Sequence, residues 1–516
     1  MFMYLGVDDH RHSAVEQLWE IAARGRGDDL QRLVRTSRNT ASEALAPAVR
    51  GVEAILSGDL VAGTLLMQRA IRRASAYEAA YLSDILLPAL TNHGEFEAAK
   101  RLVCYGMSVE RLAPCTVAHR AVLAALAGDM SESRYHSSQA LKLLEGLEDA
   151  VVYGRVVLRL ATAAYYRSEF DEAFERALSA VHWCGRAGSR RLVCAAYTIL
   201  YGLAADLYDD GELARHYARE IWSHATLAGD VSFEKYSALC LLFLAAELAD
   251  TAQVESHWKA YHYKRRSEQY ATENFHIGVV AVLRSGWQGR FDAAVASLDS
   301  LRKSSGRSLS EKALCDALEA VAHVASWDLR KARALARLAI SETITPCGNE
   351  VLHERRRRRA ARALAALVCL CIGDTVRGRR ALTLRTDLAT TFGNLDVLAG
   401  PHGVRVADSP PLLRGYVRFL NSAVKASIAV RPRGTLTPAE SEVLRALWEG
   451  TTLAQVAIDL GKSPKTVRCQ VASIYAKLSA SNRTQALRRA AELGFVLEIT
   501  SGDWAPVASI CKMSLL

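Results

Sequence analysis

Apolar and polar positions upstream of about residue 410 repeat as one unit: a turn residue, a polar residue, an apolar residue and then an alanine-rich helical stretch. Successive units lie about 34 to 46 residues apart, at Gly58-Asp59-Leu60, Gly94-Glu95-Phe96, Gly128-Asp129-Met130, Ser168-Glu169-Phe170, Gly211-Glu212-Leu213, Ala252-Gln253-Val254, Gly289-Arg290-Phe291, Trp327-Asp328-Leu329 and Gly373-Asp374. A period of this length holds one helical hairpin, which buries its apolar face only against neighbouring hairpins. The pattern predicts a stacked array of helical hairpins, with alanines such as Ala98, Ala173 and Ala293 where paired helices pass closely.

A different pattern occupies the stretch from Leu436 to Leu487, where helix starts and stops follow one another at short intervals. Caps and initial prolines mark three starts, and glycines mark two stops. The starts are Thr437-Pro438-Ala439-Glu440, Thr452 and Ser463-Pro464, and the stops are Gly450 and Gly461. The third helix carries a single apolar stripe, which predicts that it docks on the first two. The stripe comprises Val467, Val471, Ile474 and Leu478. This punctuation is typical of a helix-turn-helix that reads DNA.

The side of the third helix opposite this stripe is basic and lined by small side chains. Between Gly461 and Arg489 there are seven Lys or Arg residues and no Asp or Glu. A charged helix face is usually only solvated, but here it coincides with three caps, two glycine stops and small residues along the leading edge. The combination indicates a surface that approaches base edges closely and contacts a polyphosphate backbone.

These residues resemble the LuxR-type (GerE-type) DNA-binding domain of bacterial transcription regulators over about 60 residues, from Leu436 to Phe495. The resemblance is carried by Leu436, Thr437, Glu440, Glu442, Val443, Leu444, Gly450, Ala457, Leu460, Ser463, Thr466, Val467, Val471, Ile474, Tyr475, Lys477, Leu478, Arg483, Thr484, Gln485 and Ala486. It implies that the third helix enters the major groove. Thr466 and neighbouring basic groups would hold phosphates, and Arg468, Cys469 and Ala472 would read bases. The predicted DNA-binding set is Thr452, Ser463, Lys465, Thr466, Arg468, Cys469, Ala472 and Lys477.

Two positions depart from the pattern of that family. Gln470 stands where the family usually has a histidine, and Leu453-Ala454-Gln455 replaces a more polar run. The first departure affects a helix-packing or phosphate contact. The second reduces the number of polar contacts beside the groove and leaves the predicted fold unchanged.

The fourth helix of the domain, from Asn482 to Leu493, carries apolar residues at helical spacing. The resembled family pairs its domains through this element, which implies a homodimer on DNA. The expected dimerisation residues are Ala486, Leu487, Ala490 and Leu493. The alternative is that these side chains pack on Val443 and Leu447 within the same domain.

The upstream array resembles the tetratricopeptide-like arrays that precede LuxR-type domains in large bacterial regulators. Those relatives also carry an ATPase module, which needs a G-x-x-x-x-G-K-S/T loop, and no such loop occurs in this sequence. We therefore expect an all-α fold without the ATPase. The expected parts are an α-solenoid of tetratricopeptide-like helical hairpins at 1–410, a connecting helix and linker at 411–434, a four-helix LuxR-type domain at 435–497 and a tail at 498–516.

Composition narrows the functional classes. A formal net charge of +10 suits a nucleic-acid partner, and eleven scattered cysteines without a Cys-x-x-Cys pair fit a reducing cytosol. Asp8 and Asp9 come too early for a signal peptide, and no apolar run approaches the roughly 18 residues of a membrane span. We expect a cytoplasmic, nucleoid-associated protein that does not enter a membrane.

Other candidate chemistry has plainer interpretations. The arginines from Arg355 to Arg359 radiate around a helix, which favours a solvated face over an anion or DNA site. Cys369 and Cys371 point to different sides of a helix without a nearby His or Cys, which favours buried thiols over a metal pair. The histidines lack metal-ligand spacing, and no nucleophile motif is present. The sequence predicts no enzyme, no metal and no cofactor.

These observations predict a one-component transcription regulator that binds double-stranded DNA as a homodimer. An unidentified protein or small molecule would bind the repeats and shift the population toward the DNA-binding arrangement. RNA polymerase is a further candidate partner. The alternative is a helical-repeat interaction scaffold whose terminal domain has lost its affinity for DNA, a hypothesis that Gln470 alone favours.

Overall fold

The computed structural model describes residues 14–25, 27–36, 43–92, 95–264, 271–304, 308–344, 352–372, 374–383, 399–400, 403–404, 409–430, 436–449, 451–478 and 480–492. These residues are helices and their connections, apart from the two-residue strands β1 (Ala399–Gly400) and β2 (Gly403–Val404), which pair antiparallel. The prediction of an all-α fold is confirmed. None of the described helices is long and apolar enough to cross a membrane. The chain divides into two compact units, Met1–Leu244 with Glu255–Gln269, and Ala245–Val254 with Tyr270–Leu516.

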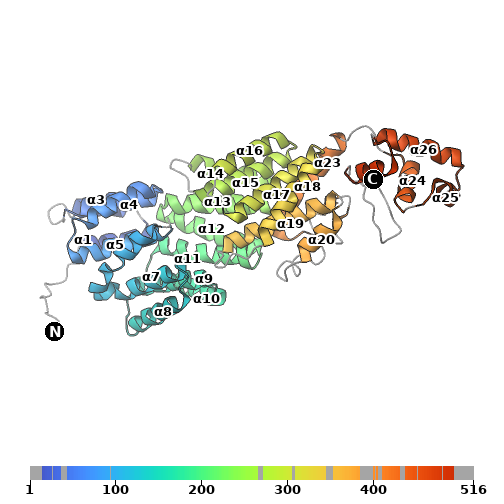
Figure 1. Ribbon diagram of the computed structural model, residues 1–516. Coiled ribbons are helices and arrows are strands. Elements are labelled where there is room, and N and C mark those ends of the chain that lie inside the picture. The colour runs from blue at the N-terminus through green and yellow to red at the C-terminus, as the bar shows by residue number, and fades with distance from the viewer. Residues whose placement is uncertain are drawn as a thin grey trace. The chain divides into compact units, whose positions relative to one another are not determined.

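Most helices upstream of the C-terminal domain form antiparallel pairs (Figure 1). In the first unit the helices are α1 (Ala14–Arg24), α2 (Gly27–Thr36), α3 (Leu45–Ser57), α4 (Leu60–Ile71), α5 (Ala76–Asn92), α6 (Phe96–Leu102), η1 (Tyr105–Ser108), η2 (Glu110–Leu112), α7 (Ala113–Leu126), α8 (Met130–Leu144), α9 (Ala150–Tyr166), α10 (Phe170–Arg186), α11 (Arg190–Gly202), the π-helical η3 (Leu203–Leu207) and α12 (Gly211–Ala228). The helices α13 (Val231–Glu247) and α14 (Thr251–Lys264) contribute residues to both units. In the second unit follow α15 (Ala271–Trp287), α16 (Phe291–Ser304), α17 (Leu309–Ala325), α18 (Leu329–Ile344), α19 (Leu352–Cys371), α20 (Thr375–Thr383), η5 (Pro411–Leu413) and α23 (Arg414–Val430).

The turns inside the pairs confirm the repeat pattern read from the sequence. Most of them contain a residue with positive φ, followed in several turns by an aspartate that caps the second helix. The positive-φ residues are Gly58, Gly128, Ser168, Asp209, Ala249, Gly289 and Trp327. The aspartate caps accept a hydrogen bond from the amide three residues on, at Asp59, Asp129, Asp210, Asp250 and Asp328. Two of the predicted units, at Gly211-Glu212-Leu213 and Ala252-Gln253-Val254, start too late in the sequence. The turns before α12 and α14 begin at Asp209 and Ala249.

The alanines that pass close to a partner helix stand at the same position in three of the helices, and one of the three predicted residues is among them. Ala173 of α10 is fully buried, as predicted. In α6 and α16 the fully buried alanines are Ala99 and Ala294, one residue after the expected Ala98 and Ala293. The expectation was therefore wrong for those two positions, because the buried alanine is the fourth residue of each helix and Ala98 and Ala293 are the third.

α1 does not belong to a pair and packs on α5 and α11. The indole Nε1 of Trp19 donates to Asp84 Oδ2 (2.8 Å). The backbone carbonyl of Trp19 accepts from Arg155 Nη2 (2.9 Å). The guanidinium of Arg155 also stacks on the indole, with Cζ 4.0 Å from the ring centroid. Arg155 and Arg159 donate to the two carboxylate oxygens of Asp84, at 3.0 and 2.6 Å. Burial alone would raise the pKa of Asp84, but the two guanidinium groups outweigh it and lower that pKa to about 2.

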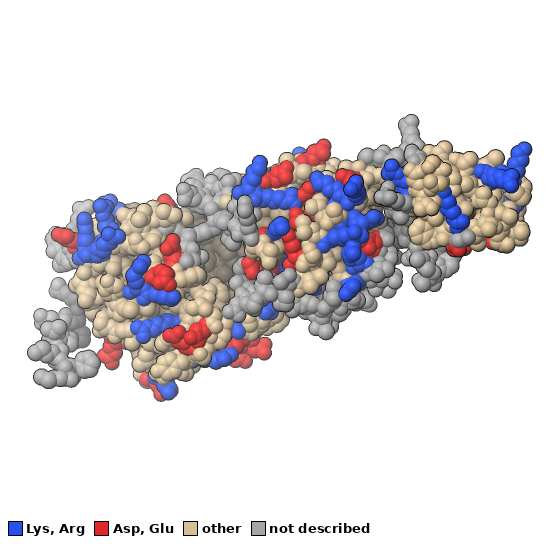
Figure 2. Space-filling model, viewed as in Figure 1, with Lys and Arg blue, Asp and Glu red and all other residues tan. Residues whose placement is uncertain are grey.

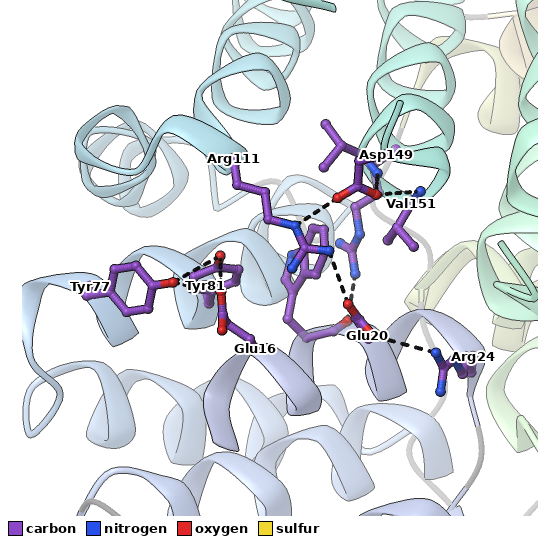
Figure 3. Close-up of polar contacts among 11 residues, drawn as sticks. Glu16, Glu20, Arg24, Tyr77, Tyr81, Arg111, Asp149 and Val151 are labelled. Carbon is purple, nitrogen blue, oxygen red and sulfur yellow. Dashed lines mark hydrogen bonds and ion pairs between the residues drawn. The ribbon is translucent and has the colours of Figure 1, made fainter. Parts of the chain in front are cut away.

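Two glutamates of α1 also find their partners far away in the sequence (Figure 3). Glu16 Oε1 accepts hydrogen bonds from the hydroxyl groups of Tyr77 and Tyr81, both at 2.6 Å. Arg111 lies between Glu20 (Nη2–Oε1 3.1 Å) and Asp149 (Nε–Oδ2 2.8 Å), as Figure 3 shows. These contacts add charge and hydrogen bonding to the apolar packing of Val15, Leu18 and Ile21 of α1. We define the α1 seat as Tyr77, Tyr81, Asp84, Arg111 and Arg155.

α23 is the last helix before the C-terminal domain, and it packs on α15, α17 and α19. Tyr416, Phe419 and Leu420 are fully buried. The ring of Phe419 stacks on Phe291 at a centroid distance of 6.0 Å. α15 approaches α23 so closely that a Cβ on Gly286 would overlap with the Phe419 ring. The connecting helix is therefore part of the folded second unit.

Polar contacts fix the N-terminal half of α23. Glu247 pairs with Arg356 of α19, and the hydroxyl of Tyr416 approaches the same carboxylate at 3.5 Å. Trp287 Nε1 donates to the carbonyl of Gly415 (3.0 Å). We define the α23 seat as Glu247, Gly286, Trp287, Phe291 and Arg356.

Two members of the Arg355–Arg359 run are buried, so the prediction of a solvated face was wrong for them. Arg356 pairs with Glu247, and Arg357 donates to Glu311 at 2.8 Å between Nη1 and Oε1. These partners lie 109 and 46 residues away in the sequence. The charge pattern around Arg356 and Arg357 therefore could not predict these ion pairs.

Candidate nucleic-acid interface

Four helices form the C-terminal domain: α24 (Pro438–Trp448), α25 (Leu453–Asp459), α26 (Pro464–Lys477) and α27 (Arg483–Glu492). The three predicted starts are all present. Thr437 and Glu440 form a reciprocal capping box, in which the Thr437 amide donates to Glu440 Oε2 (2.6 Å) and the Glu440 amide donates to Thr437 Oγ1 (3.3 Å). The hydroxyls of Thr452 and Ser463 accept from the amides of Gln455 (3.3 Å) and Thr466 (3.1 Å). Gly450, the predicted stop of the first helix, lies outside the described residues.

The turn between α25 and α26 is short because Gly461 adopts a left-handed conformation, with φ +58°. The amide of Lys462 closes the turn by donating to the carbonyl of Ala457 (2.9 Å). This is the glycine stop that the sequence predicted, and it brings the two helices of the helix-turn-helix directly together.

α26 docks on the other helices through the predicted stripe. Val467, Val471, Ile474 and Leu478 are all buried. They belong to one apolar cluster with Leu436, Val443, Leu444, Ala446, Leu447, Val456, Ala457, Ala486 and Ala490. Because the stripe is continuous, the opposite side of α26 must face outward.

The outward side of α26 carries the predicted reading residues. Lys465, Thr466, Arg468, Cys469 and Ala472 are all exposed. Only Lys465 and Arg468 bear charge among them, and the others are small. The exposed side of α26 therefore combines two cations with side chains short enough to let a helix approach a surface closely.

Thr452 and Ser463, two further members of the predicted set, are N-caps whose hydroxyls are engaged by their own helices. In Figure 2 the C-terminal domain presents Lys and Arg side chains on a largely uncharged surface. Basic and acidic side chains are interspersed over the helix pairs in the same view.

Among the seven basic residues counted in the sequence, Lys462, Lys477 and Arg483 have identified partners inside the domain. Lys462 pairs with Glu442 (3.2 Å), Lys477 pairs with Glu440 (2.6 Å), and Arg483 donates to the carbonyls of Leu447 and Thr451. Lys477 was predicted to bind DNA, but its ammonium group ties the end of α26 to the start of α24. The outward charge on α26 is therefore smaller than the sequence count indicates.

Glu440 is a structural residue whose full role the sequence reasoning missed. Besides closing the capping box, its carboxylate accepts from the Ser473 hydroxyl (2.6 Å) and from Lys477. Burial alone would raise the pKa of Glu440, but the Lys477, Ser473 and Thr437 donors outweigh it and lower that pKa to about 2. The available signal was the spacing of Ser473 and Lys477, four residues apart on one face of α26.

The structure corrects the expected dimerisation surface on α27. Ala486 and Ala490 are fully buried in the core of their own domain, where they pack with the cluster that includes Val443 and Leu447. The alternative interpretation therefore holds for both alanines. Leu487 is partly buried against the same cluster, and Leu493 lies outside the described residues. The exposed residues of α27 include Thr484 and Gln485.

Gln470, which departs from the resembled family, sits at the edge of the α26 core. Its side-chain oxygen is shielded from solvent and has no hydrogen-bond partner among the described residues. The replacement therefore leaves the packing of α26 intact while one polar atom goes unsatisfied.

Comparisons with known proteins agree with this geometry. Residues 434–490 match the family described as "Bacterial regulatory proteins, luxR family" (GerE). The chain is also 41% identical over 61 residues to the "Transcriptional regulatory protein YdfI" of Bacillus subtilis (strain 168). That alignment covers 12% of this chain and 29% of the relative, so the chain spans less than a third of that protein. The C-terminal domain is a LuxR-type helix-turn-helix domain, preceded by a large all-helical region of packed helix pairs.

Proposed function

We propose that the protein is a transcription regulator that inserts α26 into the major groove of promoter DNA. The observation that carries this proposal is the outward face of α26, which bears Lys465, Arg468 and small side chains on a helix fixed by a continuous buried stripe. A rigid helix with this face matches the recognition helix of helix-turn-helix proteins. In this proposal Arg468, Cys469 and Ala472 contact base edges, while Lys465, Thr466 and the caps Thr452 and Ser463 lie near phosphates.

The helix pairs are the proposed sensing region. The recurrent turns and buried alanines support an α-solenoid of the tetratricopeptide kind, whose extended surface would bind a protein or small-molecule effector. Binding there would change DNA affinity only if the effector prefers one arrangement of the chain over another. RNA polymerase is a further proposed partner.

The roles of the two exposed cations can be separated with the full-length protein. Arg468→Ala should relax preference at one base pair by about 1–3 kcal/mol, because a bidentate contact to a base edge is lost. Lys465→Ala should weaken all sequences alike and lower the salt slope by about one. Lys303→Ala, which removes an exposed lysine of α16, is the control and should change neither the base preference nor the salt dependence of DNA binding. Competition binding over a salt series measures all three. DNA binding that ignores salt, or identical behaviour of the three variants, would favour the interaction scaffold instead.

We further propose that the protein binds DNA as a homodimer with half-sites about one helical turn, ~10 bp, apart. Because Ala486 and Ala490 are buried, the α27 contact would have to use Leu487 together with exposed neighbours such as Thr484 and Gln485. Footprinting at saturating protein should show two protected half-sites. A single isolated half-site would contradict the dimer while leaving the assignment of α26 in place.

A further inference from the structure

α1 buries aliphatic side chains, among them Val15, Leu18 and Ile21, in the same apolar cluster as the neighbouring helix pairs, and it makes a further set of polar contacts. Neighbouring helices such as α3 and α4 meet through aliphatic groups, among them Val52, Ile55 and Met67. α1 adds to such apolar packing the side chains of Glu16, Trp19 and Glu20, each of which meets a charged or hydroxyl-bearing side chain. The two halves of this contact are 61 to 136 residues apart in the sequence, as in the binding of a separate peptide.

The residue types in the α1 seat are those that dominate the energetics of protein interfaces. Trp, Tyr and Arg are the commonest hot-spot residues, and they are most effective when aromatic anchors and charged partners are desolvated together. Trp19 is completely buried, with Arg155 at 4.0 Å and Arg111 at 5.1 Å from its ring and Tyr81 edge-on at 5.7 Å. The seat therefore holds the tryptophan of α1, with an acidic residue three positions before it and another one position after it.

The fit of α1 to this seat leaves two donors unused. Arg111 Nη1 and Arg155 Nε are both buried and lack a hydrogen-bond partner among the described residues. Arg155 is 5% exposed, so water cannot replace the missing acceptor at low cost. A helix that brought one more carboxylate or amide oxygen to this place would satisfy the seat better than α1 does.

We propose that the α1 seat is a binding site for an acidic amphipathic helix of a partner protein, and that α1 occupies it in cis. The partner would carry an acidic residue, a tryptophan and a second acidic residue at positions i, i+3 and i+4, as α1 does with Glu16, Trp19 and Glu20. Charge complementarity supports this class, because the glutamates of α1 meet two tyrosine hydroxyls and Arg111. The inference rests on the proposed function, since it names the class of effector that the helix pairs would bind.

The test uses the full chain and a fluorescent peptide with the sequence of residues 14–24. In the unaltered chain α1 fills the seat, so the apparent affinity of the peptide is reduced by the fraction of molecules whose seat is empty. Trp19→Ala weakens α1 without changing the seat. We expect the peptide to bind the Trp19→Ala chain about tenfold or more tightly than the unaltered chain. A peptide in which the same tryptophan is replaced by alanine should lose this binding.

Trp183→Ala is the matched control, because Trp183 is another tryptophan of the same unit with an arginine, Arg186, over its ring at 5.1 Å. This variant should bind the peptide no better than the unaltered chain. Arg111→Ala, combined with Trp19→Ala, should weaken peptide binding again by removing a seat residue. Equal binding by all the chains, each with unaltered circular dichroism, would overturn the proposal.

A second measurement decides the matter if Trp19→Ala does not fold. Hydrogen exchange on the unaltered chain should show faster exchange of α1 amides when the peptide is in excess, while α3 amides keep their protection. Unchanged exchange in α1 at saturating peptide would overturn the proposal. A dimer of the unaltered chain that the peptide converts to monomers would assign the seat to α1 of a second copy, and would overturn the partner helix. None of these readouts requires DNA, so a failure of operator binding would contradict the proposed function and leave the seat untouched.

Discussion

α1 in the first unit and α23 in the second are both helices outside the pairs, and each lies on the first helices of pairs in its own unit. α1 packs on α5 and α11, and α23 packs on α15, α17 and α19. Besides its buried aliphatic residues, α1 is fixed by ions and hydrogen bonds around Trp19 and Asp84. α23 is fixed mainly by shape, with Phe419 against Gly286 and the backbone of Gly415 against Ala246, and by the buried pair of Glu247 and Arg356.

The difference shows that a helix outside the pairs can be positioned either by charged contacts or by close packing. A charged seat tolerates small changes in shape but fails when one partner is removed, because the remaining charge stays buried. A close-packed seat depends less on charge, but it fails when a single methyl group is added. The two seats should therefore respond to opposite kinds of substitution.

The largest effect is expected at Asp84. Asp84→Ala leaves Arg155 and Arg159 buried without their shared carboxylate, which should cost about 3–5 kcal/mol of unfolding free energy. Chemical unfolding of the full chain, followed by the fluorescence of its tryptophans, measures the change. Asp59→Ala, which removes an exposed N-cap, is the control and should cost about 0.5–2 kcal/mol. A loss at Asp84 no larger than at Asp59 would show that the ions are not what fixes α1.

Acid should weaken the same seat by a somewhat smaller amount. The pKa of Asp84 is lowered to about 2, whereas an unfolded aspartate titrates near 3.9. Its stabilising contribution is therefore complete above about pH 4 and is lost as the pH falls toward 2. The loss should be on the order of 2–3 kcal/mol. Stability measured from pH 6 to pH 2 should show this decline, and Asp84→Asn should flatten it. An unchanged decline in the Asp84→Asn chain would assign the acid sensitivity to other carboxylates.

The shape-based seat should respond to one added methyl group. In Gly415→Ala the new Cβ would overlap with the carbonyl oxygen of Ala246, so we expect a loss of about 1–3 kcal/mol. Gly185→Ala is the matched control, because Gly185 also lies in a helix and a methyl group there would meet nothing within 4 Å. It should be neutral or stabilising, by up to about 1 kcal/mol. Equal thermal stability of the two variants would mean that α23 adjusts freely in its seat.

Sequence reasoning succeeded where the determinant is local. The Thr437, Thr452 and Ser463 caps, the left-handed Gly461 and the apolar stripe of α26 depend on residues within a few turns of each other. The hairpin turns were found for the same reason. The pattern of apolar positions determined the face of α26 that is buried, and therefore the face that is exposed.

Sequence reasoning failed where a distant partner decides the state of a side chain. Arg356 and Lys477 look like solvated or DNA-facing cations, but Glu247 and Glu440 bind them from 109 and 37 residues away. Ala486 has the spacing of an interface residue, yet the docking of α27 buries it in its own domain. Trp19 gave no sign of its role, because its partners lie on α5 and α9.

The position of α23 sets the length of the tether between the helix pairs and the C-terminal domain. Five residues separate Val430, the last residue of α23, from Leu436, the first described residue of the DNA-reading domain. Such a segment reaches at most about 20 Å. If α23 left its seat as an intact helix, its 17 residues would add about 26 Å to this tether. The greatest distance that the C-terminal domain can reach from the helix pairs would then more than double. Because the accessible volume grows with the cube of that distance, the effective concentration of the C-terminal domain near its own helix pairs would fall about tenfold.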